Sequence, residues 1–279
     1  MLLDASAPLT LLSPGGLPPL HVAAAAAAGA PAIEVLVRRE APLRMRDDRR
    51  QTNPNPNPNP NPNPSPNPSP SPNPNLRDER RQTALHAAAR AGHVGAITAL
   101  LRAAAAEEER ASRAAKEAYV ELRDRWHRTA LHWAVVNMEE AAVEALIIGG
   151  AAVNGVPMPV GKHMKQTSLP LEAPLHSAAR LPPPRAVPLL RLLLQAQADV
   201  ARTDQFGQTA LHCAAAASGS SEGGGDPAEV EAASTAVVAL LLRAGADPCH
   251  TDSNGKSAAD LASHTLAARA IRDAEGARG

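Results

Sequence analysis

One tripeptide, Ala or Pro followed by Leu-His, occurs five times in this chain and constrains its fold more than any other feature. Its five histidines are His21, His86, His132, His176 and His212. A Thr precedes three of the copies, and the stretch after each His is rich in Ala. A catalytic His occupies one special place, whereas a His that returns with the same neighbours belongs to a structural unit. The tripeptide therefore predicts a chain assembled from copies of one small unit.

The composition favours helices packed on helices. Four aromatic residues among 279 are too few for the core of an ordinary compact domain, so Ala, Leu, Val and Ile must fill the interior. A stack of thin Ala-rich units meets this condition, because each unit buries its apolar face against its two neighbours. The formal net charge is zero, so bulk electrostatics points to neither nucleic acid nor a membrane surface.

In three of the copies the longer motif Thr-Ala-Leu-His resembles the T-P-L-H-x-A signature of ankyrin repeats, whose period is about 33 residues. These copies begin at Thr83, Thr129 and Thr209. The resemblance implies an all-α repeat solenoid, in which each unit is a β-turn finger followed by two antiparallel helices. It predicts six units, at about residues 17–50, 78–123, 124–167, 168–203, 204–251 and 252–274, between tails at 1–16 and 275–279.

The repeated histidines are spaced by 65, 46, 44 and 36 residues, so every gap exceeds the ankyrin period. In the first gap, segment 46–52 nearly recurs at 77–83, with an alternating Asn-Pro and Ser-Pro tract at 53–75 between the two copies. We expect this tract to be a disordered insertion, because proline disfavours helix in the residue before it. The other extra residues are assigned to a second helix lengthened through 96–122, a loop after Asn154, a Pro-rich turn at 181–184 and a flexible Gly/Ser insertion at 218–228.

The resemblance also implies a structural role for the repeated motif residues. The Thr caps the first helix of its unit, the Leu packs between repeats, and the His hydrogen-bonds to the backbone of the neighbouring unit. These residues are Thr83, Leu85, His86, Thr129, Leu131, His132, Leu175, His176, Thr209, Leu211 and His212. An Asp five residues before the Thr begins the finger, as at Asp124 and Asp204.

The finger glycine of the family is kept in two units and replaced in two others. Gly207 and Gly255 keep it, whereas Arg81 and His127 stand at the equivalent positions. Glycine serves there because it reaches a positive φ without steric cost. The turns at Arg81 and His127 are therefore predicted to be either strained or differently shaped.

No motif in the sequence predicts catalysis. A Gly-rich phosphate loop, HExxH and CxxC are all absent. Cys213 and Cys249 each neighbour a His and so resemble halves of a zinc site, but four ligands at zinc spacing are not evident. Two cysteines give no disulfide framework and suit a reducing compartment. We expect no metal, no cofactor and no enzymatic activity, in a cytoplasmic or nuclear protein.

The positions that the repeat pattern leaves variable are the candidates for partner contact, which the resemblance places at finger tips and on the concave helix face. In this chain they are Arg80, Gln82, Arg90, Arg125, Trp126, Arg128, Asn137, Arg180, Gln205, Phe206 and Gln208. Trp126 and Phe206 take the same finger-tip position, and interface hot spots favour Trp and Arg. The alternative is that each aromatic ring packs on its own finger. The sequence predicts a protein-binding module.

Basic residues gather in the fingers of units two to four. They are Arg77, Arg80, Arg81, Arg123, Arg125, Arg128, Lys162 and Lys165. They favour a partner with an acidic segment, or else belong to a solvated surface of mixed charge. An adaptor or regulatory subunit of a larger enzyme complex is the alternative function, and a purely structural or decayed repeat protein is a further one. We expect a monomer that binds neither nucleic acid nor a membrane.

Overall fold

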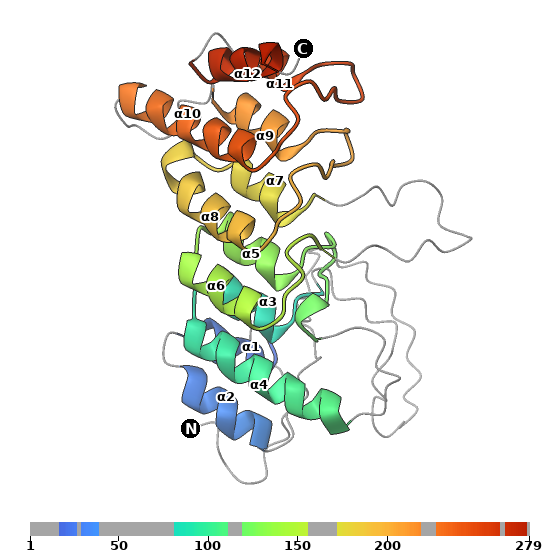
Figure 1. The fold of residues 1–279 in the computed structure, drawn as a ribbon. Coiled ribbons are helices and arrows are strands. Elements are labelled where there is room, and N and C mark those ends of the chain that lie inside the picture. Colours follow the sequence, from blue (N-terminus) through green and yellow to red (C-terminus); the bar gives the residue numbers. More distant parts are fainter. Residues whose placement is uncertain are drawn as a thin grey trace, which may run out of the picture.

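The computed structural model describes residues 17–26, 29–38, 81–110, 119–155, 172–218, 227–262 and 266–277. The expected N-terminal tail at 1–16, the Asn-Pro tract at 53–75 and most of the insertion at 218–228 lie outside this part of the chain. So do four of the basic finger residues, namely Arg77, Arg80, Lys162 and Lys165. The described residues form an all-α solenoid of paired helices (Figure 1).

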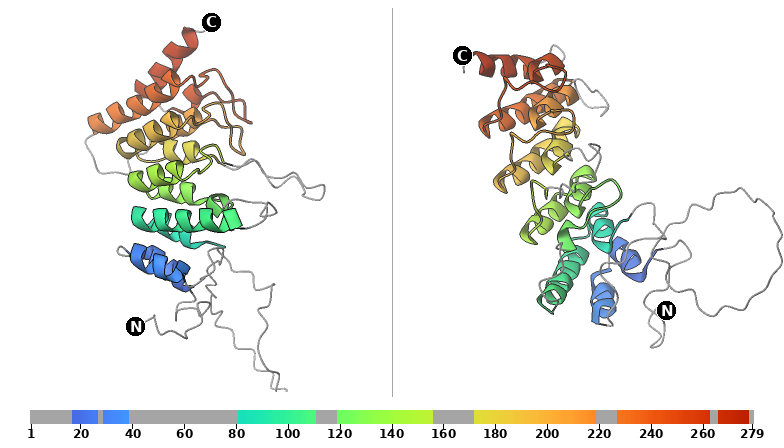
Figure 2. Two further views of the ribbon diagram at one scale, coloured as in Figure 1. Left: turned by 60° about the horizontal axis from the view of Figure 1, so that its bottom comes forward. Right: turned by 90° about the vertical axis from the view of Figure 1, so that its right-hand side faces the viewer.

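The first helices of the six units form one row, in which each packs on the next along the chain. They are α1 (Pro19–Ala25), α3 (Ala84–Arg90), α5 (Ala130–Val136), α7 (Pro174–Ala179), α9 (Ala210–Ala217) and α11 (Ala258–Leu261). The second helices form the other row, made of α2 (Gly29–Arg38), α4 (Val94–Arg110), α6 (Glu140–Ile148), α8 (Pro183–Gln195), α10 (Pro227–Arg243) and α12 (Leu266–Gly276). Both rows run through all six units (Figure 2).

The core is a continuous layer of small and branched side chains between the two rows. The motif leucines Leu85, Leu131, Leu175 and Leu211 are buried, and so are most of the alanines that follow them on the first helices. Alanine lets the short first helices approach closely, while Leu and Val from the second helices fill the space between units. Each unit therefore buries its apolar surface only against its neighbours, as expected of a repeat solenoid.

The lengthened second helix of unit two does not include residues 119–122. The described helix α4 spans 17 residues and ends at Arg110. Tyr119–Glu121 form a separate 3-10 helix, η1, and Tyr119 and Leu122 are buried. The expectation of helix through residue 122 is therefore wrong for residues 119–122, because the chain there packs on the core and turns toward the next finger.

Both terminal units are folded helix pairs. α1 packs on α3 and α2 packs on α4, while α11 and α12 pack on α9 and α10. The last helix also continues to Gly276, so the C-terminal tail begins later than the expected residue 275. Ile33 in α2 and Ile271 in α12 are buried, which shows how the end units join the common core.

An Asp carboxylate organises each described finger. Asp204 Oδ1 accepts hydrogen bonds from the backbone N–H groups of Phe206 (2.8 Å) and Gln208 (3.0 Å). Asp124 Oδ1 holds its finger in the same way, through the N–H groups of Trp126 and Arg128, both at 2.9 Å. The carboxylate thereby satisfies the turn's donors and fixes the direction in which the tip residue projects.

The fingers without glycine keep the left-handed backbone of those with it. Gly207 has φ 72°, while His127 has φ 61° and Arg81 has φ 49°. Of the two possibilities for these turns, strain is therefore the correct one, since non-glycine residues are disfavoured in this region. The helix–helix turn of unit three repeats the pattern, with Met138 at φ 61° where unit two has Gly92 at φ 70°.

Candidate partner-binding surface

The five repeated histidines bridge successive units, so they are committed to the fold. The Nε2 atom of each ring lies within hydrogen-bonding distance of a carbonyl oxygen in the next unit. The pairs are His21 with Gln82 (2.9 Å), His86 with Arg128 (3.1 Å), His132 with Glu172 (2.8 Å), His176 with Gln208 (3.0 Å) and His212 with Lys256 (3.2 Å). Because a carbonyl oxygen can only accept, Nε2 carries the ring proton and donates it.

The other ring nitrogen, Nδ1, takes part in the N-terminal cap of the first helix. In three units His Nδ1 accepts from the backbone N–H of the motif Thr and lies 2.8–2.9 Å from its hydroxyl oxygen, which completes a capping box. A ring that donates from Nε2 and accepts at Nδ1 is neutral. Burial agrees with this, since it lowers the pKa of His132 to about 4 and also lowers the pKa of His176 and His212.

The tip aromatics are exposed on the fingers of units three and five. Trp126 is 43% exposed and Phe206 is 52% exposed. Trp126 meets Trp133 of α5 edge-on, with ring centroids 6.3 Å apart, and the indole N–H of Trp133 donates to Asp124 Oδ2 at 2.9 Å. Trp126 thus packs in part on its own unit and still presents a large aromatic surface to solvent.

Two arginines flank this pair of rings. The guanidinium carbon of Arg125 lies 4.7 Å from the centroid of the Trp126 ring, and that of Arg128 lies 5.7 Å from the Trp133 ring. Both distances are within the range of cation–π attraction. The nearby Asp124 carboxylate is occupied by two backbone N–H groups and an indole N–H. Within the described residues, neither arginine forms an ion pair.

Sequence reasoning missed Trp133. It follows the motif His directly, at a position that holds Ala87, Ser177 and Cys213 in units two, four and five. A large aromatic residue where both neighbouring units have a small side chain was the available signal. Asn137 ends the same helix, where its side-chain amide donates to the Trp133 carbonyl at 2.8 Å.

Three residues predicted for partner contact make contacts within the solenoid. Gln82 is only 5% exposed, so its side chain is unavailable to a partner. Arg180 binds Asp204 at 2.8 Å and Glu172 at 2.9 Å, which ties unit four to the finger of unit five. The Gln208 side chain lies 3.4 Å from Asp252 of the next finger. Their nominally variable positions are used here for contacts between units.

Five of the other predicted residues lie on two fingers. Arg125, Trp126 and Arg128 share the unit-three finger, and Gln205 and Phe206 share the unit-five finger. Arg90 is half-buried at the end of α3, and Arg80 lies outside the described residues. The Phe206 carbonyl also accepts from the Ser253 N–H at 2.9 Å, so the unit-five finger rests on that of unit six.

The two thiols have different surroundings. Cys213 is buried, and burial raises its pKa to about 12. Cys249 is exposed, while His250 beside it bonds to the Gly207 carbonyl at 3.1 Å. Among the described residues, no group of three or more His, Cys, Asp or Glu side chains could hold a metal ion.

Comparison with known proteins agrees with this architecture. Family profiles described as "Ankyrin repeats (3 copies)", "Ankyrin repeats (many copies)" and "Ankyrin repeat" match residues 67–156, 175–222 and 206–253. The crystal structure of the ankyrin repeat domain of Bcl-3, called a unique member of the IkappaB protein family, superposes with a TM-score of 0.62 at 20% identity, over 100% of this chain and 89% of that one. No curated protein sequence matches significantly.

The stacked helix pairs and their bridging histidines define a helical repeat protein of the kind that presents an extended surface. The chain is an ankyrin-repeat protein. Ankyrin repeats generally mediate protein–protein interaction and are typically non-catalytic. Within the described residues, no helix is long and apolar enough to cross a membrane.

Proposed function

We propose that this protein is a non-catalytic module that binds a partner protein through its finger tips and the adjoining concave helix face. The observation that carries the proposal is the exposure of Trp126 and Phe206 at equivalent tips. Large aromatic rings that stay in water on a rigid scaffold are typical of interface hot spots, since contact with a partner removes their apolar surface from solvent. The Asp-bonded fingers hold both rings in place before binding.

The charges around Trp126 favour a partner with an acidic segment. Arg125 and Arg128 are held against aromatic rings and have no acidic partner among the described residues. A guanidinium in this position can offer its N–H edges to a carboxylate or phosphate. Because such contacts at a surface are screened by ions, binding should weaken as salt is raised.

The proposal is tested by quantitative affinity capture with matched variants. The Trp126→Ala/Phe206→Ala protein removes both tip rings, and Val94→Ala/Leu266→Ala removes two side chains of similar exposure (37% and 53%) from the starts of second helices. Partners that bind through the fingers should be depleted at least tenfold by the first change and retained after the second. Equal recovery by both variants would refute the finger-tip proposal.

The electrostatic part has its own measurement. The affinity of a captured partner for the wild type should fall as salt rises from about 50 to 300 mM, and Arg125→Gln/Arg128→Gln should flatten that dependence. If the affinity of the partner were independent of salt, the proposal of an acidic segment would be wrong. The proposed contact with the aromatic rings would not be affected.

A further inference from the structure

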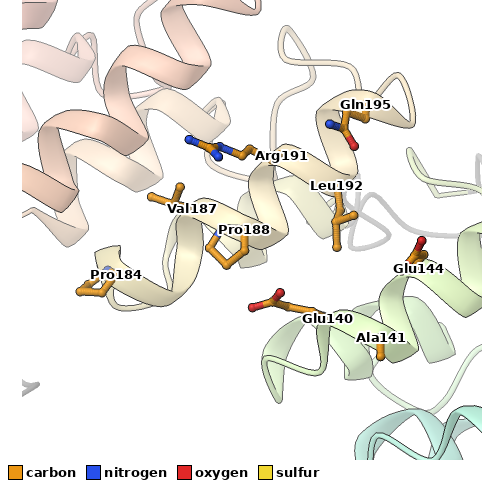
Figure 3. Close-up of a pocket in the computed structure, with 9 residues that line it drawn as sticks. All are labelled: Glu140, Ala141, Glu144, Pro184, Val187, Pro188, Arg191, Leu192 and Gln195. Carbon is orange, nitrogen blue, oxygen red and sulfur yellow. The ribbon is translucent and has the colours of Figure 1, made fainter.

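A cleft of about 620 Å³ opens between α6 and α8, in the row of second helices (Figure 3). Glu140, Ala141 and Glu144 line it from α6. Its α8 wall consists of Pro184, Val187, Pro188, Arg191, Leu192 and Gln195. The fingers adjoin the first helices, so the cleft is a separate feature from the surface proposed above.

The cleft arises from unequal helix lengths. α6 has nine residues, whereas α8 has 13 and both α4 and α10 have 17. The short helix leaves apolar side chains of its neighbour partly uncovered, and Val187, Pro188 and Leu192 are half-buried. At the end of α6, Ile148 is 80% exposed. These partly or fully exposed apolar side chains are surface that a partner could cover.

The α6 wall is acidic and lacks compensating charge. Glu140 and Glu144 are exposed, and neither forms an ion pair with another described residue. No Lys or Arg occurs in α6. The favourable interaction of a carboxylate with a helix N-terminus accounts for Glu140 in the first turn, but it falls off before the second turn, where Glu144 lies.

Each wall of the cleft is a row of side chains along one helix. Glu140 and Glu144 are one turn apart on one face of α6, and Ile148 follows one turn later at the end of the helix, beyond the residues that line the cleft. The residues on the α8 wall recur at intervals of three and four, so they form a parallel stripe on that helix. In Figure 3 the Glu140 side chain extends from α6 toward the α8 wall near Pro188, whereas Ala141 points away from it. Two parallel helical stripes form a groove that fits the ridge of a third helix.

We propose that this groove binds an amphipathic helix of a partner protein that carries Lys or Arg along one edge of its apolar face. Apolar side chains of that helix contact Leu192, Pro188 and Ile148. Two cations four residues apart on it lie opposite Glu140 and Glu144, whose spacing is the same. Arg191 on the α8 wall favours an acidic residue on the other edge, so the charges also set the direction in which the helix lies.

The test uses two fluorescent peptides of about 18 residues with the same leucine face, one flanked by Lys and the other by Glu. Fluorescence anisotropy measures their binding to the full-length wild type, to Glu140→Lys/Glu144→Lys and to Ile148→Ala. Asp273→Lys/Glu275→Lys, on α12, is the control because it changes the net charge equally at a distant site. Circular dichroism checks that the helix content of each variant is unchanged.

The Lys peptide should bind the wild type in the micromolar range, with a Kd raised at least tenfold by Glu140→Lys/Glu144→Lys, raised severalfold by Ile148→Ala and unchanged by the control. The Glu peptide should prefer the charge-reversed protein. Equal weakening by the α12 control would show attraction to net charge alone and overturn the proposal. So would binding of the Lys peptide that is indifferent to Glu140 and Glu144, or no binding up to about 500 µM.

Discussion

The first helices of units four and five differ in their N-terminal caps. The N-cap residue is Ala173 in unit four and Thr209 in unit five. Both units send His Nε2 to a carbonyl of the next unit. Thr209 also completes a capping box with His212, whereas Ala173 has no hydroxyl and His176 Nδ1 is buried without a hydrogen-bond partner among the described residues. Unit four therefore keeps the hydrogen bond from His to the next unit although it lacks the capping box. This indicates that packing and the His hydrogen bond stabilise the stack of units.

The largest expected effect tests whether the two units share an equally packed core. Leu175 and Leu211 are both buried. Replacing either with Ala should lower the free energy of unfolding by about 2–5 kcal/mol, because a cavity is left in a packed interior. Urea unfolding followed by circular dichroism measures this. A loss below about 1 kcal/mol for Leu175→Ala alone would show that unit four is loosely packed as well as uncapped.

Acid should weaken the bridges, and His132 provides the clearest case. Its pKa is about 4 in the fold against an ordinary 6.5, because burial disfavours the charged ring. The unfolded chain therefore binds more protons between these values, so stability falls as the pH is lowered from 6.5 toward 4. The full difference corresponds to about 3 kcal/mol for this ring.

Urea unfolding at pH 7 and pH 5 should show this loss, and His132→Gln should reduce it. Asp252 and Asp260 have pKa values lowered by hydrogen bonds from the backbone of Lys256 and Ser257, so they titrate below this window. Stability that is the same at pH 7 and pH 5 would contradict the buried neutral rings.

The sequence predicted what recurs and missed what depends on the assembled stack. The repeated unit followed from the motif, because the same neighbours return around each copy, whereas the helix pairs and the bridging His followed from the resemblance of that motif to ankyrin repeats. The burial of Gln82 and the ion pairs of Arg180 could not be predicted, since a variable position is exposed or covered according to the finger beside it. The cleft beside α6 likewise depends on the relative lengths of adjacent helices.

The fingers allow a sharper comparison of strained and unstrained turns. Gly207 and His127 hold equivalent positions at φ 72° and 61°. Gly207→Ala should cost about 1–2 kcal/mol, because a Cβ is disfavoured in this conformation, and that atom would lie 2.9 Å from Ser253 Oγ. His127→Gly should gain up to about 1 kcal/mol by relieving the same strain. Thermal unfolding measures both, and a loss of stability in His127→Gly would mean that its imidazole contributes contacts of its own.

The smallest effect restores to unit four the cap that unit five has. Ala173 has φ −73° and ψ 156°, close to the −85° and 169° of Thr209, so Thr fits this backbone without strain. Ala173→Thr should raise the free energy of unfolding by about 1 kcal/mol, since a Thr hydroxyl would supply the partner that His176 Nδ1 lacks. Thr209→Ala should cost a similar amount, and the double variant should return to near the wild-type value. If Ala173→Thr instead destabilises the protein, the buried site has no room for the hydroxyl, and the uncapped helix start is the better packed of the two.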